Sequence, residues 1–301
     1  MIIKAGQQAR ADLFGLGAVI CWSTVATAFK LTLRYLTPAQ LLLFSAAVSW
    51  FFLGAVLVRR GMLRQAFHEL KQRRARALLM GLLNPCLYYL ILLQAYNMLP
   101  AQEAQAINFT WALTISVLAV PFLGHSLRLR EVIAVLISYC GVLIIATRGD
   151  PLSLRFASPV GVGLALLSTF LWAFYWLLGT RDKIEPVTGL FLNFTFAIPL
   201  LIAYCFVTGE LKEIAWIGLP GILYIGIFEM GLTFVLWLKA MRLTASTTRT
   251  ANLIFIAPPL SLVFIFLVLG EPILASTLAG LALILSGLAL QRLHQTRKVK
   301  L

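Results

Sequence analysis

Apolar residues fill the chain in ten long runs, and polar residues collect in the short connections between these runs. A helix rises about 1.5 Å per residue, so a run of about 20 residues crosses a hydrocarbon core of about 30 Å. The runs are continuous rather than alternating, which argues against a membrane β-barrel. The pattern predicts an all-α integral membrane protein with ten transmembrane helices. We place them at 12–30, 37–58, 75–97, 103–123, 129–147, 158–180, 186–208, 216–238, 246–268 and 272–291.

The second half of the chain resembles the first half. A shift of 145 residues places Asn84 on Glu229. A shift of 146 residues superposes four pairs of glycines: Gly15 on Gly161, Gly17 on Gly163, Gly124 on Gly270 and Gly141 on Gly287. Five spans per half is an odd number, so the second half enters the membrane in the opposite direction. The sequence therefore predicts two inverted five-helix repeats, 12–148 and 158–291, around a central cavity, an arrangement typical of transporters. The first span resembles a secretory signal, but its counterpart in the second half favours retention.

Charge patterning sets the expected orientation. The chain is 60% hydrophobic and 12% charged, with a net charge of +14. With the N-terminus inside, 20 of the 25 Lys and Arg residues face the cytoplasm, and only Lys30, Arg34, Arg148, Arg155 and Lys212 face outward. This bias predicts cytoplasmic N- and C-termini. It also accounts for the basic excess, so we expect membrane lipids and no nucleic acid as partners.

The connection from Arg59 to Arg76 has two interpretations. Leu63, Ala66, Phe67 and Leu70 fall on one face of a helix, and basic residues flank them. Such a helix would lie on anionic lipid headgroups. A solvated loop between two spans fits the same residues.

Enzyme signatures are missing. No Gly-Lys dipeptide occurs, so the chain lacks the phosphate-binding loop of ATP-driven systems. The three histidines lie at membrane borders, and the four cysteines lie in four different spans. These placements predict no metal site, disulfide or catalytic set. We therefore expect neither a catalytic residue nor a cofactor.

Polar residues at membrane depth are the first candidates for a site. Glu229 lies near the middle of the eighth span, where a charge costs roughly 2.5–3.5 kcal/mol on insertion scales. It could bind a substrate amine, accept a proton, or serve as a protonated or hydrogen-bonded carboxyl that bridges helices. Asn84 occupies the repeat-related position and precedes Pro85, which loosens the helix.

Aromatic side chains suggest the kind of solute. Stacked rings suit planar or amphipathic molecules, including cations, although each ring taken alone could pack against lipid or core. The candidate substrate-binding residues of this type, with the asparagine that accompanies them on the fourth span, are Tyr88, Asn108, Trp111, Trp172, Tyr175 and Trp176.

Glu103 and Arg249 superpose at the shift of 146 residues, at the start of the fourth and ninth spans. The predicted topology puts Glu103 near the outer mouth and Arg249 near the inner one. Arg249 could attract a substrate carboxylate or extend to the headgroups. Asn252 lies less than one turn deeper and completes the predicted substrate-binding set.

Small residues form one stripe on the last helix of each half. They are Ala134, Ser138 and Gly141 in the first half, and Ser276, Gly280 and Gly287 in the second. Such stripes let helices approach closely. Packing within one chain is the favoured interpretation and a homodimer contact the alternative, so we expect a monomer or a weak homodimer.

Four local patterns stand out: Ile20-Cys21-Trp22-Ser23, Phe170-Leu171-Trp172-Ala173, Leu238-Lys239-Ala240-Met241, and Leu269-Gly270-Glu271-Pro272 followed by Gly280 and Gly287. Together they resemble the EamA-type branch of the drug/metabolite transporter superfamily, over roughly 12–291. Gly124-His125 replaces the expected Gly-Glu in the first half.

A second resemblance is to the YddG-type aromatic amino-acid exporters. It rests on Gln102-Glu103-Ala104 and on Asn108-Phe109-Thr110-Trp111, with departures at Thr110 and Ala112. Together the resemblances imply a bacterial inner-membrane exporter that moves amino acids, related metabolites or amphipathic drugs by alternating access. A gradient-driven channel and a lipid-modifying membrane enzyme are the competing interpretations.

Overall fold

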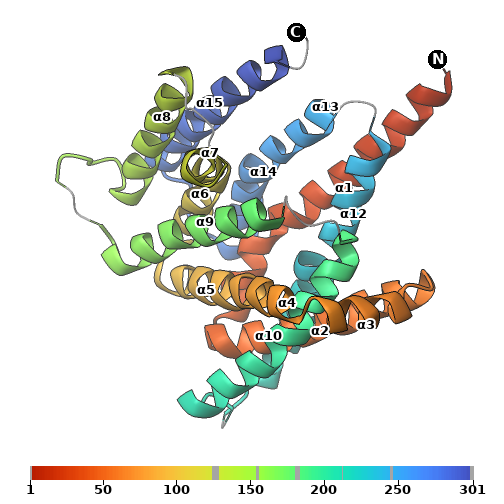
Figure 1. Ribbon diagram of the computed structural model, residues 1–301. Helices are drawn as coiled ribbons and strands as arrows, with labels where there is room; N and C mark the ends of the chain where they lie inside the picture. The colour runs from red at the N-terminus through yellow and green to blue at the C-terminus, as the bar shows by residue number, and fades with distance from the viewer. Residues whose placement is uncertain are drawn as a thin grey trace. The chain divides into compact units, whose positions relative to one another are not determined.

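The computed structural model describes residues 2–123, 129–153, 156–179, 184–211, 213–244 and 247–298. Gly124, His125, Arg155 and Lys212 lie outside these ranges. Within the described part, every regular element is a helix (Figure 1). The all-helical membrane fold predicted from the apolar runs is therefore confirmed.

Nine helical stretches of the described part are long and apolar enough to span a membrane. They are Gly6–Thr32, Pro38–Arg59, Arg74–Met98, Ala101–Phe122, Leu129–Ala146, Pro159–Gly179, Pro186–Thr208, Trp216–Leu243 and Arg249–Leu269. A shorter apolar helix covers Ala275–Gln291. The predicted tenth span at 272–291 begins later than expected, because residues 270–274 are not helical.

The helices pack as two compact units, and each unit combines segments from both predicted halves. Unit 1 comprises Met1–Leu93 and Lys183–Phe264, and unit 2 comprises Gln94–Asp182 and Ile265–Leu301. The helices of unit 1 are α1 (Ile2–Thr32), α2 (Pro38–Arg59), α3 (Leu63–Gln72), α4 (Arg74–Gly81), η1 (Leu82–Leu87), the first half of α5 (Tyr88–Met98), α10 (Pro186–Thr208), η2 (Trp216–Gly218), α11 (Leu219–Tyr224), η3 (Ile225–Leu232), α12 (Thr233–Leu243), α13 (Thr247–Asn252), η4 (Leu253–Ile256) and α14 (Ala257–Phe264). Unit 2 contains α6 (Ala101–Asn108), α7 (Trp111–Leu123), α8 (Leu129–Ala146), α9 (Pro159–Gly179), η5 (Ile265–Leu269) and α15 (Ala275–Lys298).

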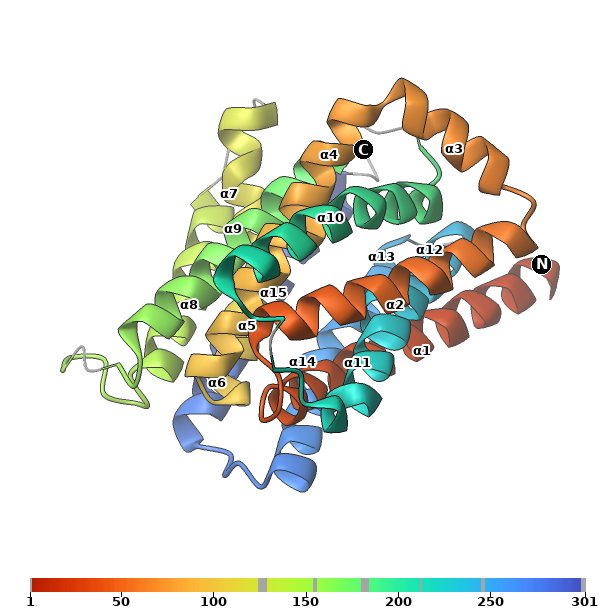
Figure 2. The same cartoon turned by 90° about the horizontal axis from the view of Figure 1, so that it is seen from below.

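In unit 1, α1 packs against α12 and α14, and α2 packs between α10 and η3 (Figure 2). Local sequence sets where two of these helices begin. Thr37 and Gln40 form a capping box before α2, with Pro38 in the first turn. Glu185 caps α10 by accepting the Thr188 backbone N–H at 2.8 Å. These caps fix where α2 and α10 begin.

Two irregular segments interrupt the third and eighth spans. The third span kinks within η1, where the Asn84 backbone is not helical, whereas η3 is a π-helix; the shift of 145 residues that relates Asn84 to Glu229 overlays the two segments. A π-turn carries one extra residue, and such turns are frequent at functional sites. Ser49 of α2 donates to the Met230 carbonyl oxygen in η3 at 2.9 Å, which helps to satisfy the altered backbone of that turn.

In unit 2, α8 and α15 lie side by side (Figure 1). Gly141 and Gly280 face each other so closely that a Cβ on either glycine would fall on the carbonyl oxygen of the other. Ser138 donates to the Ile284 carbonyl oxygen at 3.2 Å. The stripe of small residues therefore serves helix packing inside one chain, the favoured interpretation from sequence.

The connection after α2 is a helix, α3, rather than an irregular loop. Its Ala66 is fully buried, and the Phe67 ring meets the Phe191 ring of α10 edge-on at 6.3 Å. Arg64 and Lys71 are exposed. Of the two interpretations of this connection, the structure supports the helix, and its position on lipid headgroups stays a prediction.

Candidate functional site

Glu229 lies in η3 and is buried, with 7% of its surface exposed. Its Oε1 accepts a hydrogen bond from the Tyr89 hydroxyl at 2.9 Å. Its Oε2 is buried and has no hydrogen-bond partner in the part of the chain that the structure describes. A buried carboxylate oxygen without a donor is costly, so this geometry suits a group that receives a cation from outside the fold.

Tyr89, the neighbour of the predicted Tyr88, is the residue that bonds to Glu229. The Tyr88 and Tyr89 rings contact each other at 4.8 Å, and the Phe29 ring of α1 meets Tyr89 edge-on at 6.4 Å. Counting four residues from Asn84 selects Tyr88 in a regular helix, but the backbone at Asn84 is kinked and the regular spacing does not hold across it. Sequence periodicity could not reveal this kink. We call Phe29, Tyr88, Tyr89 and Glu229 the Glu229 cluster.

Asn84 lies on the third span, a few residues before Tyr88 and Tyr89 of the Glu229 cluster. It is 2% exposed, and its backbone leaves helical geometry with φ −144° and ψ 116°. Its Oδ1 is buried and finds no hydrogen-bond partner among the described residues. Both repeat-related polar residues therefore lie where a span is irregular, Asn84 at a kink and Glu229 in a π-helix, and each carries an acceptor oxygen without a partner among the described residues.

Four of the predicted aromatic residues come together in unit 2. Trp172 of α9 stacks on Tyr175 at 5.6 Å and meets Trp176 edge-on at 6.0 Å. Trp111, the first residue of α7, meets Trp172 edge-on at 6.5 Å. Trp172 is 7% exposed, and the Trp176 Nε1 is buried without an acceptor in the described structure. We call Trp111, Trp172, Tyr175 and Trp176 the aromatic cluster.

Asn108 lies beside the aromatic cluster in sequence and ends α6. Its Nδ2 donates to Ser168 Oγ of α9 at 3.0 Å. The predicted fourth span is broken here, because residues 109–110 form a turn between α6 and α7. The Thr110 hydroxyl donates to the Ile107 carbonyl oxygen at 2.7 Å within this turn. Ser168 was not predicted, since one more serine on an apolar helix carries no distinctive signal.

The two repeat-related charged residues each bind an oppositely charged side chain. Glu103 is 1% exposed, and its Oε1 accepts from Arg148 Nε at 2.9 Å. Arg249 Nη2 lies 2.7 Å from Asp12 Oδ2 in unit 1, and the Arg249 side chain is 66% exposed. Arg249 therefore has an internal carboxylate partner in addition to any substrate. Asn252, the last residue of α13, lies three residues further along the chain.

The chemistry available in both clusters is recognition rather than bond making. Among the described residues, no three potential metal ligands come together. The Glu229 cluster offers a carboxylate and a phenol inside an apolar helix bundle, which suits an ammonium group. The aromatic cluster offers ring faces and edges, which suit a planar apolar group.

Comparison with known proteins gives a consistent picture. A model described as the EamA-like transporter family matches residues 9–147 and again residues 159–292, which indicates an internal repeat. The uncharacterized transporter YvbV of Bacillus subtilis is 29% identical over 278 residues, covering 90% of this chain and 88% of the relative. The protein RarD of Escherichia coli is 26% identical over 215 residues, covering 69% and 67%. A crystal structure of a protein that is 20% identical covers 96% of this chain and 98% of its own, with a TM-score of 0.68.

Proposed function

Because the chain belongs to the EamA-like transporter family of the drug/metabolite transporter superfamily, we propose that it exports amino acids, aromatic ones among them, across the bacterial inner membrane. Related small metabolites and amphipathic drugs belong to the same proposal. The family match makes the chain a membrane transporter rather than an enzyme. Its substrate and its direction of transport are the parts that we propose.

The proposed topology has ten spans in two inverted repeats, with both termini in the cytoplasm. The double family match and the odd number of predicted spans in each half support it. The excess of Lys and Arg in the connections assigned to the cytoplasm supports the orientation. Inverted repeats of this kind work by alternating access.

The observation that carries the substrate proposal is the buried Glu229 carboxylate. One of its oxygens is held by Tyr89, and the other has no donor among the described residues. A substrate ammonium group would supply that donor and balance the charge at membrane depth. Amino acids carry such a group, and Asn84 with its own unsatisfied Oδ1 offers a second acceptor on the third span.

The aromatic cluster supports the aromatic part of the proposal. Trp172 presents its ring to three neighbouring rings of unit 2, and a planar apolar group would join or replace one of these contacts. Such ring contacts contribute roughly 0.5–1.5 kcal/mol each beyond buried area. Asn108 would act beside this cluster as a polar positioning group.

The decisive experiment is reconstitution of the purified protein in liposomes, with labelled phenylalanine, tryptophan, leucine and lysine as substrates. We expect saturable uptake of the aromatic amino acids and acceleration by unlabelled substrate on the opposite side. Linear flux without this acceleration would instead indicate a gradient-driven channel. Flux no higher than in protein-free liposomes for every amino acid would refute the substrate proposal.

Competition with substrate fragments tests the role of Glu229 separately. Phenethylamine carries the ring and the amine, whereas 3-phenylpropionate carries the ring and the carboxylate. We expect phenethylamine to inhibit phenylalanine transport in the wild type and to lose that effect in Glu229→Gln. Equal inhibition of the wild type and the variant by phenethylamine would exclude Glu229 as the amine partner.

A further inference from the structure

The helix α6 has no cap of its own. The residue at its N-cap position is Pro100, which has no side-chain group to accept a hydrogen bond from the first turn. The first backbone N–H groups of any helix need acceptors from elsewhere. Ala101 and Gln102 are buried, so their N–H groups need acceptors from the protein rather than from water.

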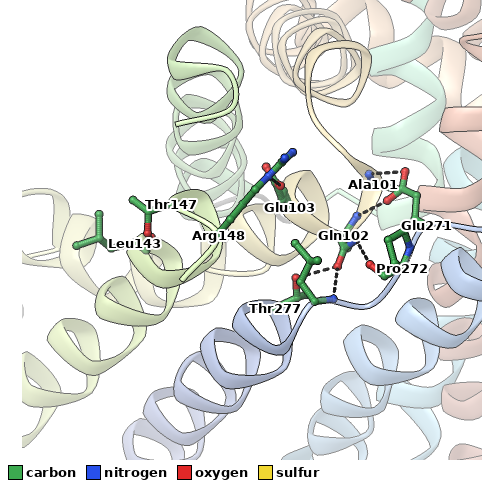
Figure 3. Close-up of polar contacts among 10 residues, drawn as sticks. Ala101, Gln102, Glu103, Leu143, Thr147, Arg148, Glu271, Pro272 and Thr277 are labelled. Atoms are coloured by element: carbon green, nitrogen blue, oxygen red, sulfur yellow. Dashed lines mark hydrogen bonds and ion pairs between the residues drawn. The ribbon is translucent and has the colours of Figure 1, made fainter. Parts of the chain in front are cut away.

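Glu271 supplies the missing acceptors from a distant part of the sequence. It lies in the non-helical segment between η5 and α15, directly after Gly270, whose φ is +69°. Its Oε1 accepts from the Ala101 N–H at 3.1 Å, and its Oε2 accepts from the Gln102 N–H at 3.5 Å. Figure 3 shows the carboxylate facing the start of α6. The negative charge also lies at the positive end of the helix dipole.

Gln102 makes a second set of hydrogen bonds, to the segment that follows Glu271. Its Nε2 donates to the Pro272 carbonyl oxygen at 2.8 Å, and its Oε1 accepts from the Thr277 hydroxyl of α15 at 2.8 Å (Figure 3). Gln102 and Thr277 are 3% and 1% exposed, so water cannot replace these bonds. The next residue, Glu103, is held by Arg148. Three successive residues at the start of α6 are therefore tied to other parts of unit 2.

This attachment at the N-terminus positions the C-terminal end of α6. The helix has eight residues and is thus about 12 Å long. Its last residue is Asn108, and Trp111 of the aromatic cluster follows within one turn. A short rigid helix fixed at its N-terminus transmits any rotation or shift directly to these two residues.

We propose that Glu271 is a positioning residue of the transport site, which fixes α6 by capping its N-terminus and thereby sets the position of Asn108 and Trp111. This inference rests on the proposed role of Asn108 and Trp111 in substrate binding. It assigns a physical role, the capping of α6, to the glutamate of the Gly270-Glu271-Pro272 motif. Neither buried area nor the Glu229 cluster accounts for that residue.

Glu271→Ala and Glu185→Ala make a matched pair of variants, because Glu185 caps α10 in unit 1 by the same kind of bond. Hydrogen exchange, read by mass spectrometry, reports each cap directly. We expect Glu271→Ala to speed exchange at the start of α6 about fivefold, which corresponds to about 1 kcal/mol for a lost cap. Glu271→Gln keeps one acceptor oxygen and should give an intermediate effect without disturbing folding. Unchanged exchange of α6 in both Glu271 variants would refute the cap.

A disulfide cross-link measures the position of Asn108 without any substrate. Asn108→Cys and Ser168→Cys replace two residues in direct contact, in a chain whose four native cysteines are changed to serine. We expect Glu271→Ala to lower the rate of cross-linking several-fold and Glu185→Ala to leave it unchanged. An equal rate in all three backgrounds would refute the positioning role, whatever the wild type transports.

Transport kinetics complete the test. We expect Glu271→Ala to raise KM for phenylalanine about fivefold with kcat nearly unchanged, and Glu271→Gln to restore part of the loss. Faster exchange of α6 with an unchanged KM would reduce Glu271 to a structural cap and overturn the proposal. Wild-type failure to transport amino acids would instead refute the proposed function, and the cross-link would still decide the role of Glu271.

Discussion

Replacing Glu229 by glutamine separates a substrate-binding carboxylate from one that merely bridges helices. The substitution keeps the side chain's length and its ability to accept the Tyr89 hydrogen bond, which spans 2.9 Å in the wild type. It removes the negative charge. Transport and stability should respond differently, because only transport uses that charge.

The magnitudes follow from the burial of Glu229. A charge at mid-membrane costs about 2.5–3.5 kcal/mol, and a hydrogen bond to a charged group returns about 1.5–3 kcal/mol. These terms nearly cancel, so we expect the free energy of unfolding to change by about 1 kcal/mol or less. The lost bond to a substrate ammonium group is worth about 1.5–3 kcal/mol, which corresponds to a KM that is about ten- to a hundredfold higher.

Thermal unfolding in detergent and counterflow in liposomes measure the two effects on the same preparations. Glu103→Gln is the matched control, because Glu103 is also buried with one oxygen unpartnered among the described residues, but its other oxygen already pairs with a charged group, Arg148. We expect this control to lower the unfolding temperature more than Glu229→Gln does. If Glu229→Gln transports phenylalanine with wild-type KM, or if its stability and transport fall together, the reasoning is refuted.

Three further outcomes are expected. Gly280→Leu should destabilise the protein by about 1–3 kcal/mol, because its Cβ meets the Gly141 backbone, and an unchanged unfolding temperature would contradict the close packing of α8 and α15. Asp12→Asn and Arg249→Gln should each change stability by about 1 kcal/mol or less, as expected for an exposed ion pair; if Arg249 also attracts the substrate carboxylate, only Arg249→Gln lowers amino-acid uptake. Trp172→Leu should weaken phenylalanine relative to leucine about fivefold in competition assays, and unchanged selectivity would argue against the aromatic cluster.

The topology itself can be tested by labelling. Single cysteines introduced at Gln7 and at Leu301 of a cysteine-free chain should react with a membrane-impermeant maleimide only in inside-out vesicles. Reaction of the two positions from opposite sides of the membrane would contradict the proposed orientation.

Much of the fold could be predicted because membrane helices are specified by continuous apolar runs. The start of α2 also follows from local chemistry, since Thr37, Pro38 and Gln40 form a recognisable capping pattern. The tenth span was predicted too early because Pro272 and its neighbours are apolar enough to extend the run. Hydropathy does not record that this segment instead folds back to the start of α6.

The arrangement of the site was less predictable because it depends on contacts between distant segments. Glu229 could be found from its charge alone, and the aromatic residues from their spacing on α9. Tyr89 could not, since its contact with Glu229 is made after a kink at Asn84 that residue counting misses. Glu271 belongs to a motif that the sequence displays plainly, but its partners lie about 170 residues away in the chain.

Because η1 and η3 are irregular, the number of residues in each span decides which side chains face one another at the site. Each residue of a helix turns the following side chains by about 100°. Deleting one residue from η1 would therefore carry Tyr89 round the helix and away from Glu229, although every side chain of the pair would still be present. Insertions and deletions of a single residue in these two spans could alter selectivity among relatives as effectively as substitutions do.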